Sequence, residues 1–260
     1  MPWVTRGLAD GVVTTRYPAR PDGYGSGFRA AVVVNGTLPA GRSDAVVGLC
    51  PTDAIRVARE VPVVDPDRCV LCGRCVEALP EVFSFSPALE TAHRSRPLEA
   101  NSDGPLASTR TALATRTRAL RRSIYVRHVD AGSDGSEEWE VAALTGPIYD
   151  VQRLGVYFTA SPRHADLLLV TGAGSVAMAE PLRRTYDAMP APKVVVAVGT
   201  DAATGGPLRA SYAGTVGVTE LIPVDVVVPG SPPSPFSILH GILLAVGLLD
   251  PASTSARVRP

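Results

Sequence analysis

All four cysteines of this chain lie between positions 50 and 75. Cys69, Cys72 and Cys75 follow one another at three-residue intervals, and Cys50 stands directly before a proline. Three thiolates at this tight spacing can hold one iron-sulfur cube, and a cysteine before proline is the ligand that a second, paired motif lends to it. The sequence therefore predicts one 4Fe-4S cluster bound by these four side chains.

Both cysteine motifs are incomplete, and each supplies what the other lacks. The downstream run has Leu79 where its own fourth cysteine would stand, and the missing companions of the upstream cysteine fall at Val46, Ser43 and Ala40. The four thiols thus suffice for one cluster and leave none for another. Structural zinc is the competing interpretation, although zinc sites usually use two separated pairs of ligands. Unligated cysteines in a hydrophobic core are the remaining alternative.

The chain has 260 residues and a mass of 27.1 kDa, which allows one large domain or two of ordinary size. Hydrophobic residues make up 45% and charged residues 19%, which is enough for a buried core. Basic and acidic residues cancel at 25 each, so the overall charge gives no argument for nucleic acid as a partner. The longest apolar run, 236–249, is too short to span a membrane. Because the N-terminus also lacks a secretory signal pattern, we expect a protein of the reducing cytoplasm.

From residue 123 onward, hydrophobic strands alternate with helical stretches. The expected strands are 124–129, 156–160, 167–171, 194–198 and 224–228, and the expected helices are 137–144, 176–188 and 235–249. This order predicts a parallel sheet that helices cover on both faces. Ligands bind beyond the carboxyl ends of the strands in such sheets, which singles out the loops at 131–136, 172–175, 199–206 and 229–234. The polar, arginine-bearing segment 91–122 is expected to be a linker and a basic arm.

Two successive parts of the chain resemble two known protein families. Residues 1–90 resemble the two-cluster ferredoxin subunit of complex I and of formate hydrogenlyase, down to Arg16-Tyr17-Pro18 after an amphipathic N-terminal segment. Residues 123–250 resemble the 20 kDa subunit of complex I and the small subunit of membrane-bound NiFe hydrogenases. The matching motifs are His128-Val-Asp-Ala-Gly-Ser133, Gly146-Pro-Ile-Tyr-Asp150, Ala160-Ser-Pro-Arg-His-Ala-Asp166, Met178-Ala-Glu-Pro-Leu-Arg-Arg-Thr-Tyr-Asp187 and Val228-Pro-Gly-Ser-Pro-Pro233.

This resemblance implies a fused protein. Its first part is a ferredoxin-like α+β domain over residues 1–90, which the linker and basic arm of 91–122 connect to the second part. The second part is a flavodoxin-like α/β domain with a parallel sheet over residues 123–250, followed by a tail at 251–260.

The second family normally holds a 4Fe-4S cluster of its own. By the resemblance, its four ligand positions are Asp134, Glu137, Asp201 and Ser231 in this chain. Carboxylate and hydroxyl oxygens are hard ligands, which do not replace four thiolates around an iron-sulfur cluster. We therefore expect no cluster in the α/β domain. Solvated or hydrogen-bonded carboxylates, a hard cation such as magnesium or calcium, and a proton-handling group are the alternatives for this site.

The resemblance implies an iron-sulfur subunit of a membrane-attached complex related to energy-converting hydrogenases or complex I, which carries electrons through the single cluster. The alternative is a non-redox scaffold or assembly subunit with a structural cluster. No group of nucleophile, base and orienting acid gives the chain a catalytic site of its own. The implied partners are a hydrogenase or complex I large-subunit-like protein and membrane-embedded subunits, which would hold the chain on the cytoplasmic face.

The first dozen residues carry an apolar stripe of Trp3, Val4, Leu8 and Val12. Two interpretations are open for it. The stripe packs on the ferredoxin-like domain, or it docks against a membrane-embedded partner subunit.

Overall fold

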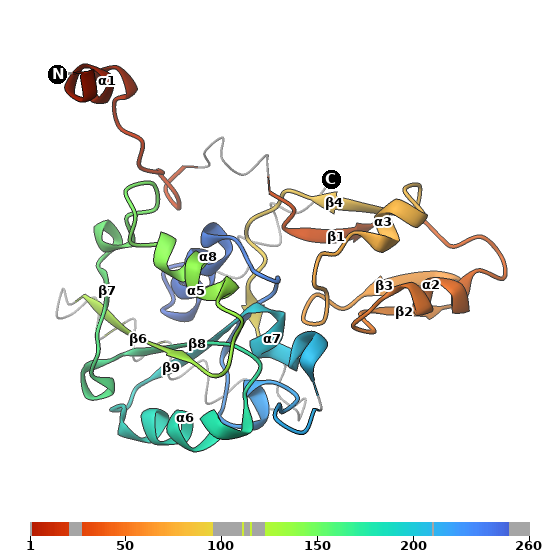
Figure 1. Cartoon of the computed structure of the whole chain (residues 1–260). Helices are drawn as coiled ribbons and strands as arrows, with labels where there is room; N and C mark the ends of the chain where they lie inside the picture. The colour runs from red at the N-terminus through yellow and green to blue at the C-terminus, as the bar shows by residue number, and fades with distance from the viewer. Residues whose placement is uncertain are drawn as a thin grey trace.

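The structure, a computed structural model, describes residues 2–20, 28–95, 111, 115, 123–209 and 211–249. Two lobes lie side by side, with helix α1 (Pro2–Asp10) projecting from the larger one (Figure 1). The smaller lobe comes from the N-terminal part of the chain and the larger lobe mainly from residues after 123. The expected basic arm, apart from Thr111 and Thr115, and the expected tail lie outside the described residues.

The smaller lobe repeats one order of elements twice. Its first half has strand β1 (Ala31–Val34), helix α2 (Ser43–Leu49) and strand β2 (Ile55–Ala58), and its second half has strand β3 (Val61–Val64), helix α3 (Arg74–Ala78) and strand β4 (Phe83–Ser86). The outer strands β1 and β4 pair in antiparallel fashion, and so do the inner strands β2 and β3. This pairing places the two halves against each other, as the ferredoxin-like interpretation expects.

The larger lobe is built on a six-stranded sheet in the order β5-β10-β9-β8-β6-β7. Its strands are β5 (His93–Arg94), β6 (Ile124–Asp130), β7 (Val156–Phe158), β8 (Leu167–Thr171), β9 (Val194–Val198) and β10 (Val226–Val228). Its helices are α5 (Ser136–Ala143), α6 (Val176–Ala188), α7 (Gly199–Thr204) and α8 (Pro235–Ala245), with short 3-10 turns η2 (Val151–Leu154), η3 (Pro162–His164), η4 (Gly206–Leu208) and η5 (Val218–Glu220). The five strands after residue 123 pair in parallel, which confirms the predicted sheet.

Helices cover both faces of this sheet. One face packs against α5 and α8 and the other against α6 and α7, and each face has its own hydrophobic core. Every residue of β8, β9 and β10 is buried. This explains why these strands are hydrophobic throughout instead of alternating with polar residues.

The segments that precede and follow the smaller lobe in the sequence pack on the larger lobe. Strand β5 adds to the sheet edge, antiparallel to β10, with His93 opposite Val227. Upstream, the backbone amide of Thr15 donates to the carbonyl oxygen of Ile148 at 2.7 Å. The expectation that the two halves bury separate cores holds for the core of the smaller lobe, whereas Tyr17 and Ala92 join the core of the larger lobe. The domain boundary at residue 90 stays a prediction.

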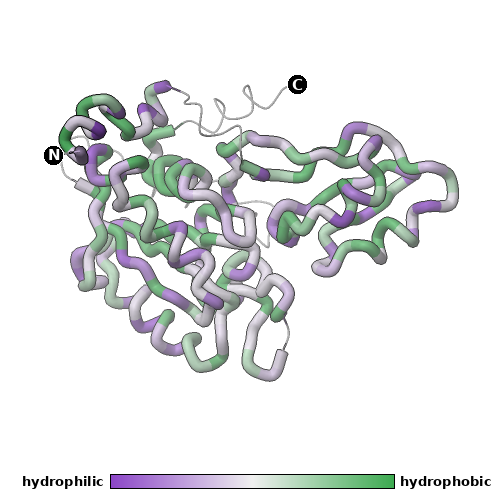
Figure 2. The backbone as a smooth tube through the Cα atoms, turned by 45° about the horizontal axis from the view of Figure 1, so that its top comes forward, coloured by the Kyte–Doolittle hydropathy of each residue, from purple (hydrophilic) through white to green (hydrophobic). Residues whose placement is uncertain are grey.

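Helix α1 makes no packing contact that buries a side chain. Trp3 is 74% exposed and Leu8 is 79% exposed. In Figure 2 this helix carries both hydrophobic and hydrophilic residues. The interpretation in which the apolar stripe packs on the ferredoxin-like domain is therefore wrong, and docking on a partner stays a prediction. None of the helices in the described parts of the chain is long and apolar enough to cross a membrane.

Candidate iron-sulfur site and the neighbouring carboxylates

The four cysteines come from three different elements of the smaller lobe and border one pocket. Cys50 ends helix α2, Cys69 and Cys72 lie in the loop after β3, and Cys75 lies in the first turn of α3. The repeat of strand, helix and strand brings the end of α2 beside the loop before α3. The structure thus brings the upstream cysteine to the same pocket as the downstream run, and their role as cluster ligands stays a prediction.

Burial and mutual repulsion raise the pKa values of two of these thiols, Cys69 and Cys75. Burial raises the pKa of Cys69 to about 11, and the charges of the other three cysteines add to the effect. Burial likewise raises the pKa of Cys75. The backbone amide of Ala54 donates to Sγ of Cys50 at 3.1 Å. Iron must displace the protons when it binds, and its positive charge offsets the repulsion among the four thiolates.

The spread of the four thiols around the pocket distinguishes a cluster site from a site for one metal ion. Zinc draws its ligands to a single point at about 2.3 Å for each sulfur, whereas each cysteine of a 4Fe-4S site binds a different iron. Within the described residues, no three histidine, cysteine or acidic side chains are gathered tightly enough for a single ion. The four thiols nevertheless border the same pocket. This geometry favours a 4Fe-4S cluster over zinc.

The positions that would serve a second cluster are filled by the hydrophobic core of the smaller lobe. Val46 is 1% exposed and Leu79 is 6% exposed, and both pack with Ile55 and Phe83. Apolar side chains therefore occupy the space near these two positions that a second set of ligands would need.

Two backbone positions make the tight cysteine loop possible. Gly73 begins α3 with φ +79°, and a Cβ there would lie 3.2 Å from the ring of Phe85. Leu71 also has a left-handed φ, of 55°, and its backbone amide favours the thiolate of Cys69. The loop thus turns once between Cys69 and Cys72, at Leu71, and once between Cys72 and Cys75, at Gly73.

Helix α7 of the larger lobe holds the cluster-binding loop by its backbone. The hydroxyl of Thr200 donates to the carbonyl oxygen of Cys69 at 3.1 Å, and the hydroxyl of Thr204 donates to that of Asp67 at 3.1 Å. Arg209 binds the carboxylate of Asp53 from the same side. The sequence predicted a glycine-rich loop at 199–206, and a six-residue helix is too short to leave a periodic pattern. These threonines were therefore missed.

Replacing Thr200 by valine removes this contact and keeps the shape of the side chain. We expect the free energy of unfolding to fall by about 0.5–1.5 kcal/mol, the usual net contribution of one hydrogen bond. Urea unfolding of the full chain measures the change. Thr185→Val is the matched control, because the exposed hydroxyl of Thr185 donates to Pro181 in its own helix. An equal loss in both variants would contradict a specific role for the contact between the lobes.

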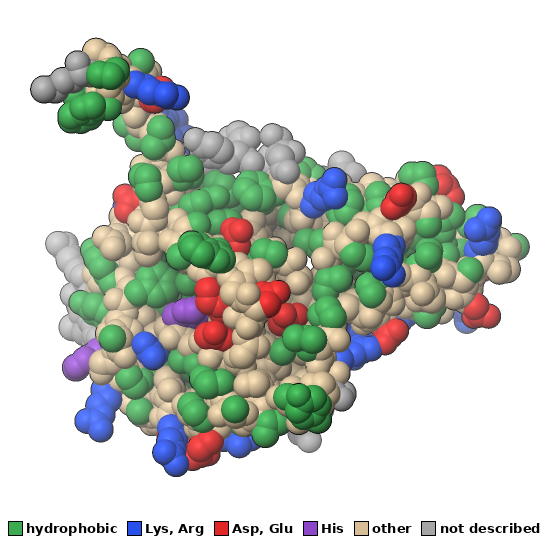
Figure 3. All heavy atoms as spheres, viewed as in Figure 1, with side chains coloured by type: hydrophobic (Ala, Val, Ile, Leu, Met, Phe, Trp, Pro, Cys, Tyr) green, Lys and Arg blue, Asp and Glu red, His purple; other side chains and the backbone are tan. Residues whose placement is uncertain are grey.

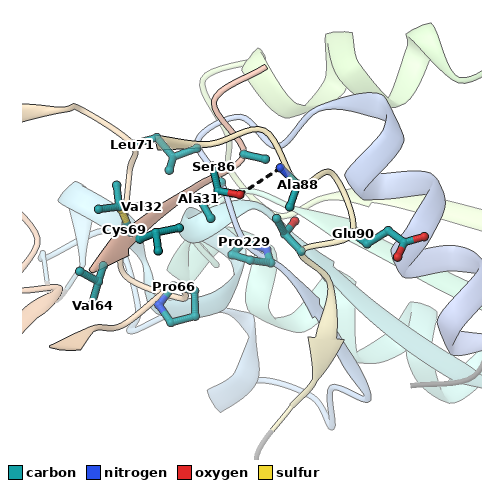
Figure 4. Close-up of a pocket in the computed structure, with 14 residues that line it drawn as sticks. Ala31, Val32, Val64, Pro66, Cys69, Leu71, Ser86, Ala88, Glu90 and Pro229 are labelled. Carbon is teal, nitrogen blue, oxygen red and sulfur yellow. Dashed lines mark hydrogen bonds between the residues drawn. The ribbon is translucent and has the colours of Figure 1, made fainter. Parts of the chain in front are cut away.

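An apolar pocket of about 170 Å³ lies where the two lobes meet (Figure 4). Cys69, Val64 and Leu71 line it from the smaller lobe, and Pro229 lines it from the loop after β10. Glu90 also borders it, and its carboxylate accepts a hydrogen bond from the hydroxyl of Tyr17 at 3.2 Å. Cys69 borders both this pocket and the cysteine pocket, so one side of the cluster site faces the larger lobe.

The four positions predicted as a former cluster site lie at the carboxyl edge of the sheet. Asp134 follows β6, Glu137 lies in the first turn of α5 and Asp201 lies in α7. Ser231 follows β10, and its neighbour Gly230 accepts a hydrogen bond from the amide of Thr200 at 2.7 Å. Figure 3 shows acidic side chains gathered on this face of the molecule.

The environments of these carboxylates differ. Glu137 and Asp201 are buried, so the interpretation that they are solvated is wrong for both of them. Burial and, secondarily, the charge of Asp201 raise the pKa of Glu137 to about 7. Burial and the charge of Asp134 raise the pKa of Asp201. Hydrogen bonds from Ser136 lower the pKa of Asp134. The structure therefore places the three carboxyl groups near one another but buries only those of Glu137 and Asp201.

Comparison with known proteins identifies two matching regions of the chain. A model of the 4Fe-4S binding domain matches residues 62–78, and a model of the 20 kDa subunit of NADH ubiquinone oxidoreductase matches residues 135–245. A probable membrane-bound hydrogenase subunit, mbhJ, of Pyrococcus furiosus is 40% identical over 134 residues, which cover 52% of this chain and 80% of that protein. The chain belongs to the family of the NADH ubiquinone oxidoreductase 20 kDa subunit.

Two further proteins match part of the chain. Formate hydrogenlyase subunit 7 of Escherichia coli is 37% identical over 154 residues, which span 59% of this chain and 59% of the relative's length. A chain in the structure of the membrane-bound sulfane sulfur reductase, an archaeal respiratory membrane complex, is 29% identical with a TM-score of 0.46. That match covers 52% of this chain and 75% of the other.

Proposed function

We propose that this chain is the iron-sulfur subunit of a membrane-attached complex related to energy-converting hydrogenases or complex I. It carries electrons through a single 4Fe-4S cluster bound by Cys50, Cys69, Cys72 and Cys75. The observation that carries this proposal is the convergence of all four cysteines of the chain on one pocket. The names of the relatives support the type of complex, since they include a membrane-bound hydrogenase subunit and a formate hydrogenlyase subunit.

In this proposal, the α/β domain binds the cluster-binding loop and holds it in position. Thr200 and Thr204 hold the loop that carries Cys69, so the cluster stays against α7. Asp134, Glu137, Asp201 and Ser231 offer oxygen in place of thiolate, which argues against a second cluster in this domain. We infer that electrons leave through partner subunits, a large-subunit-like protein and membrane-embedded proteins, which hold the chain at the cytoplasmic face of the membrane.

Iron analysis of the anaerobically purified full chain tests the proposal. We expect about four irons and four sulfides per chain and one paramagnetic signal in the reduced state, since one 4Fe-4S cluster has that composition. Stoichiometric zinc would contradict the cluster. About eight irons would contradict the single site and would require ligands other than these cysteines.

A scaffold role with a structural cluster is the second candidate. The hydrogen bonds between α7 and the cluster-binding loop favour it, because a cluster that rigidifies this loop would also fasten the two lobes together. A redox titration separates the two functions. Reversible reduction of the cluster within the range of biological donors supports electron transfer, whereas a cluster that stays oxidised or breaks down on reduction supports the scaffold.

A further inference from the structure

Two buried carboxylates at the edge of the sheet each have one oxygen without a hydrogen-bond partner among the described residues. Glu137 is 0% exposed and Asp201 is 8% exposed. Within the described residues, neither Oε1 of Glu137 nor Oδ1 of Asp201 has a hydrogen-bond partner. Oε2 of Glu137, at 3.1 Å, shares the single hydroxyl proton of Ser136 with Oδ1 of Asp134, at 2.7 Å. An ionised carboxylate in such a place is costly, because it has lost water and gained little in return.

Glycines let the main chain close against both unpartnered oxygens. A Cβ on Gly199, which has φ +91°, would lie 2.7 Å from Oε1 of Glu137. A Cβ on Gly206, which has φ +51°, would overlap Oδ1 of Asp201. The two carboxyl groups are thus enclosed by backbone that no larger residue could form without movement. This enclosure explains how acidic side chains stay dry at the end of a sheet.

The neighbouring elements do not neutralise the pair. Strands β8, β9 and β10, which pack against α7, contain no titratable residue. The charged or titratable groups on the other adjoining elements are Asp134 before α5, Glu138 and Glu140 on α5, Glu220 on η5, Arg209 after η4, His240 on α8, and Asp67, Arg68 and Cys69 in the cluster-binding loop against α7. Arg209 is engaged with Asp53 and the carbonyl oxygen of Thr52, and burial lowers the pKa of His240 to about 4, so its ring is neutral. The acidic groups therefore dominate this region.

We propose that Glu137 and Asp201 form a proton-binding pair, in which one of the two buried carboxyl groups holds a proton, at the positions where the family resemblance places cluster ligands. One proton removes one of two buried negative charges and lets the remaining carboxylate stay ionised. Burial and the charges of Asp201 and Asp134, which raise the pKa of Glu137, support this arrangement. The proposal goes beyond the proposed function and holds whether or not the cluster transfers electrons.

A proton suits this site better than a hard cation. Calcium takes six to eight oxygen ligands and magnesium demands an octahedral set. The third carboxylate is committed elsewhere, because Oδ1 of Asp134 accepts hydrogen bonds from both the amide and the hydroxyl of Ser136. Among the described residues, no three acidic, histidine or cysteine side chains are gathered for a metal ion. One proton needs a single carboxyl oxygen, whereas two buried carboxylates cannot replace the hydration shell of a cation.

Infrared difference spectroscopy of the cluster-containing full chain tests the pair. Between about pH 5 and pH 9, a range that brackets the carboxyl and neutral pKa values, we expect a protonated carboxyl signal that disappears with a midpoint near neutrality. The signal should be lost in Glu137→Gln and altered in Asp201→Asn. Glu138→Gln is the matched control and should keep it, because Glu138 accepts hydrogen bonds from Ser133 and Thr171.

Three results would overturn the proposal. They are a wild-type chain without such a signal near neutral pH, a signal that survives both Glu137→Gln and Asp201→Asn, and calorimetric binding of magnesium or calcium chloride that Glu137→Gln abolishes. Glutamine matches the shape of a protonated glutamate, so the variant is expected to fold. Should it fail to fold, the wild-type and Asp201→Asn spectra still decide the matter. The iron content of each sample separates this result from a failure of the proposed function.

Discussion

Replacing Cys50 by serine or alanine is expected to abolish the 4Fe-4S cluster, although this residue lies far from the other three ligands in the sequence. The structure places its sulfur at the same pocket as Cys69, Cys72 and Cys75. A cube of four irons needs a ligand at each corner, and a serine hydroxyl is a poor donor to iron-sulfur clusters. We expect iron and sulfide to fall from about four per chain to near zero, with loss of the brown colour.

Thr52→Val is the control for this experiment. Thr52 lies beside the upstream ligand, with its hydroxyl 3.6 Å from Sγ of Cys50, but it is no thiolate donor. Its hydroxyl also donates to the carbonyl oxygen of Arg68 at 2.6 Å, so the variant tests whether local disturbance alone releases iron. We expect the control to keep its cluster. If Cys50→Ala keeps about four irons per chain, the cluster must have another fourth ligand and the proposed site is wrong.

Replacing Phe236 by alanine is expected to cause the largest loss of stability among changes away from the cysteines. The ring is 1% exposed and meets Tyr17, Phe28 and Tyr149 edge to face, with centroids 6.0, 6.2 and 5.0 Å away. Truncation of a buried phenylalanine costs about 3–5 kcal/mol, from lost transfer free energy and from the cavity left behind. Because these rings come from distant segments, we also expect the N-terminal segment to become sensitive to protease.

Urea unfolding and limited proteolysis measure the two effects. Tyr212→Ala is the control, because that aromatic ring is 100% exposed and its loss should change stability by less than about 0.5 kcal/mol. A loss in Phe236→Ala as small as in the control would mean that the segment around Tyr17 does not pack on the larger lobe in solution. Equal protease sensitivity in both variants would lead to the same conclusion.

The sequence by itself determined the features that depend on residue type and local pattern. The spacing of Cys69, Cys72 and Cys75, with the proline after Cys50, predicted four ligands that the structure gathers at one pocket. Continuous hydrophobic runs predicted the strands of the parallel sheet, because a strand covered on both faces needs no polar side. The family resemblance also placed oxygen-bearing side chains, Glu137 and Asp201, at positions that normally carry thiols.

Only the tertiary structure decided which distant segments meet. The two residues of β5 carry no periodic signal, yet they extend a sheet whose other strands all come later in the chain. Thr200 and Thr204 look like loop residues until α7 is seen against the cluster-binding loop. The burial of Glu137 and Asp201 was equally hidden, because acidic residues are usually solvated. Desolvation and hydrogen bonding depend on what surrounds a group in space, and chain neighbours alone do not specify that surrounding.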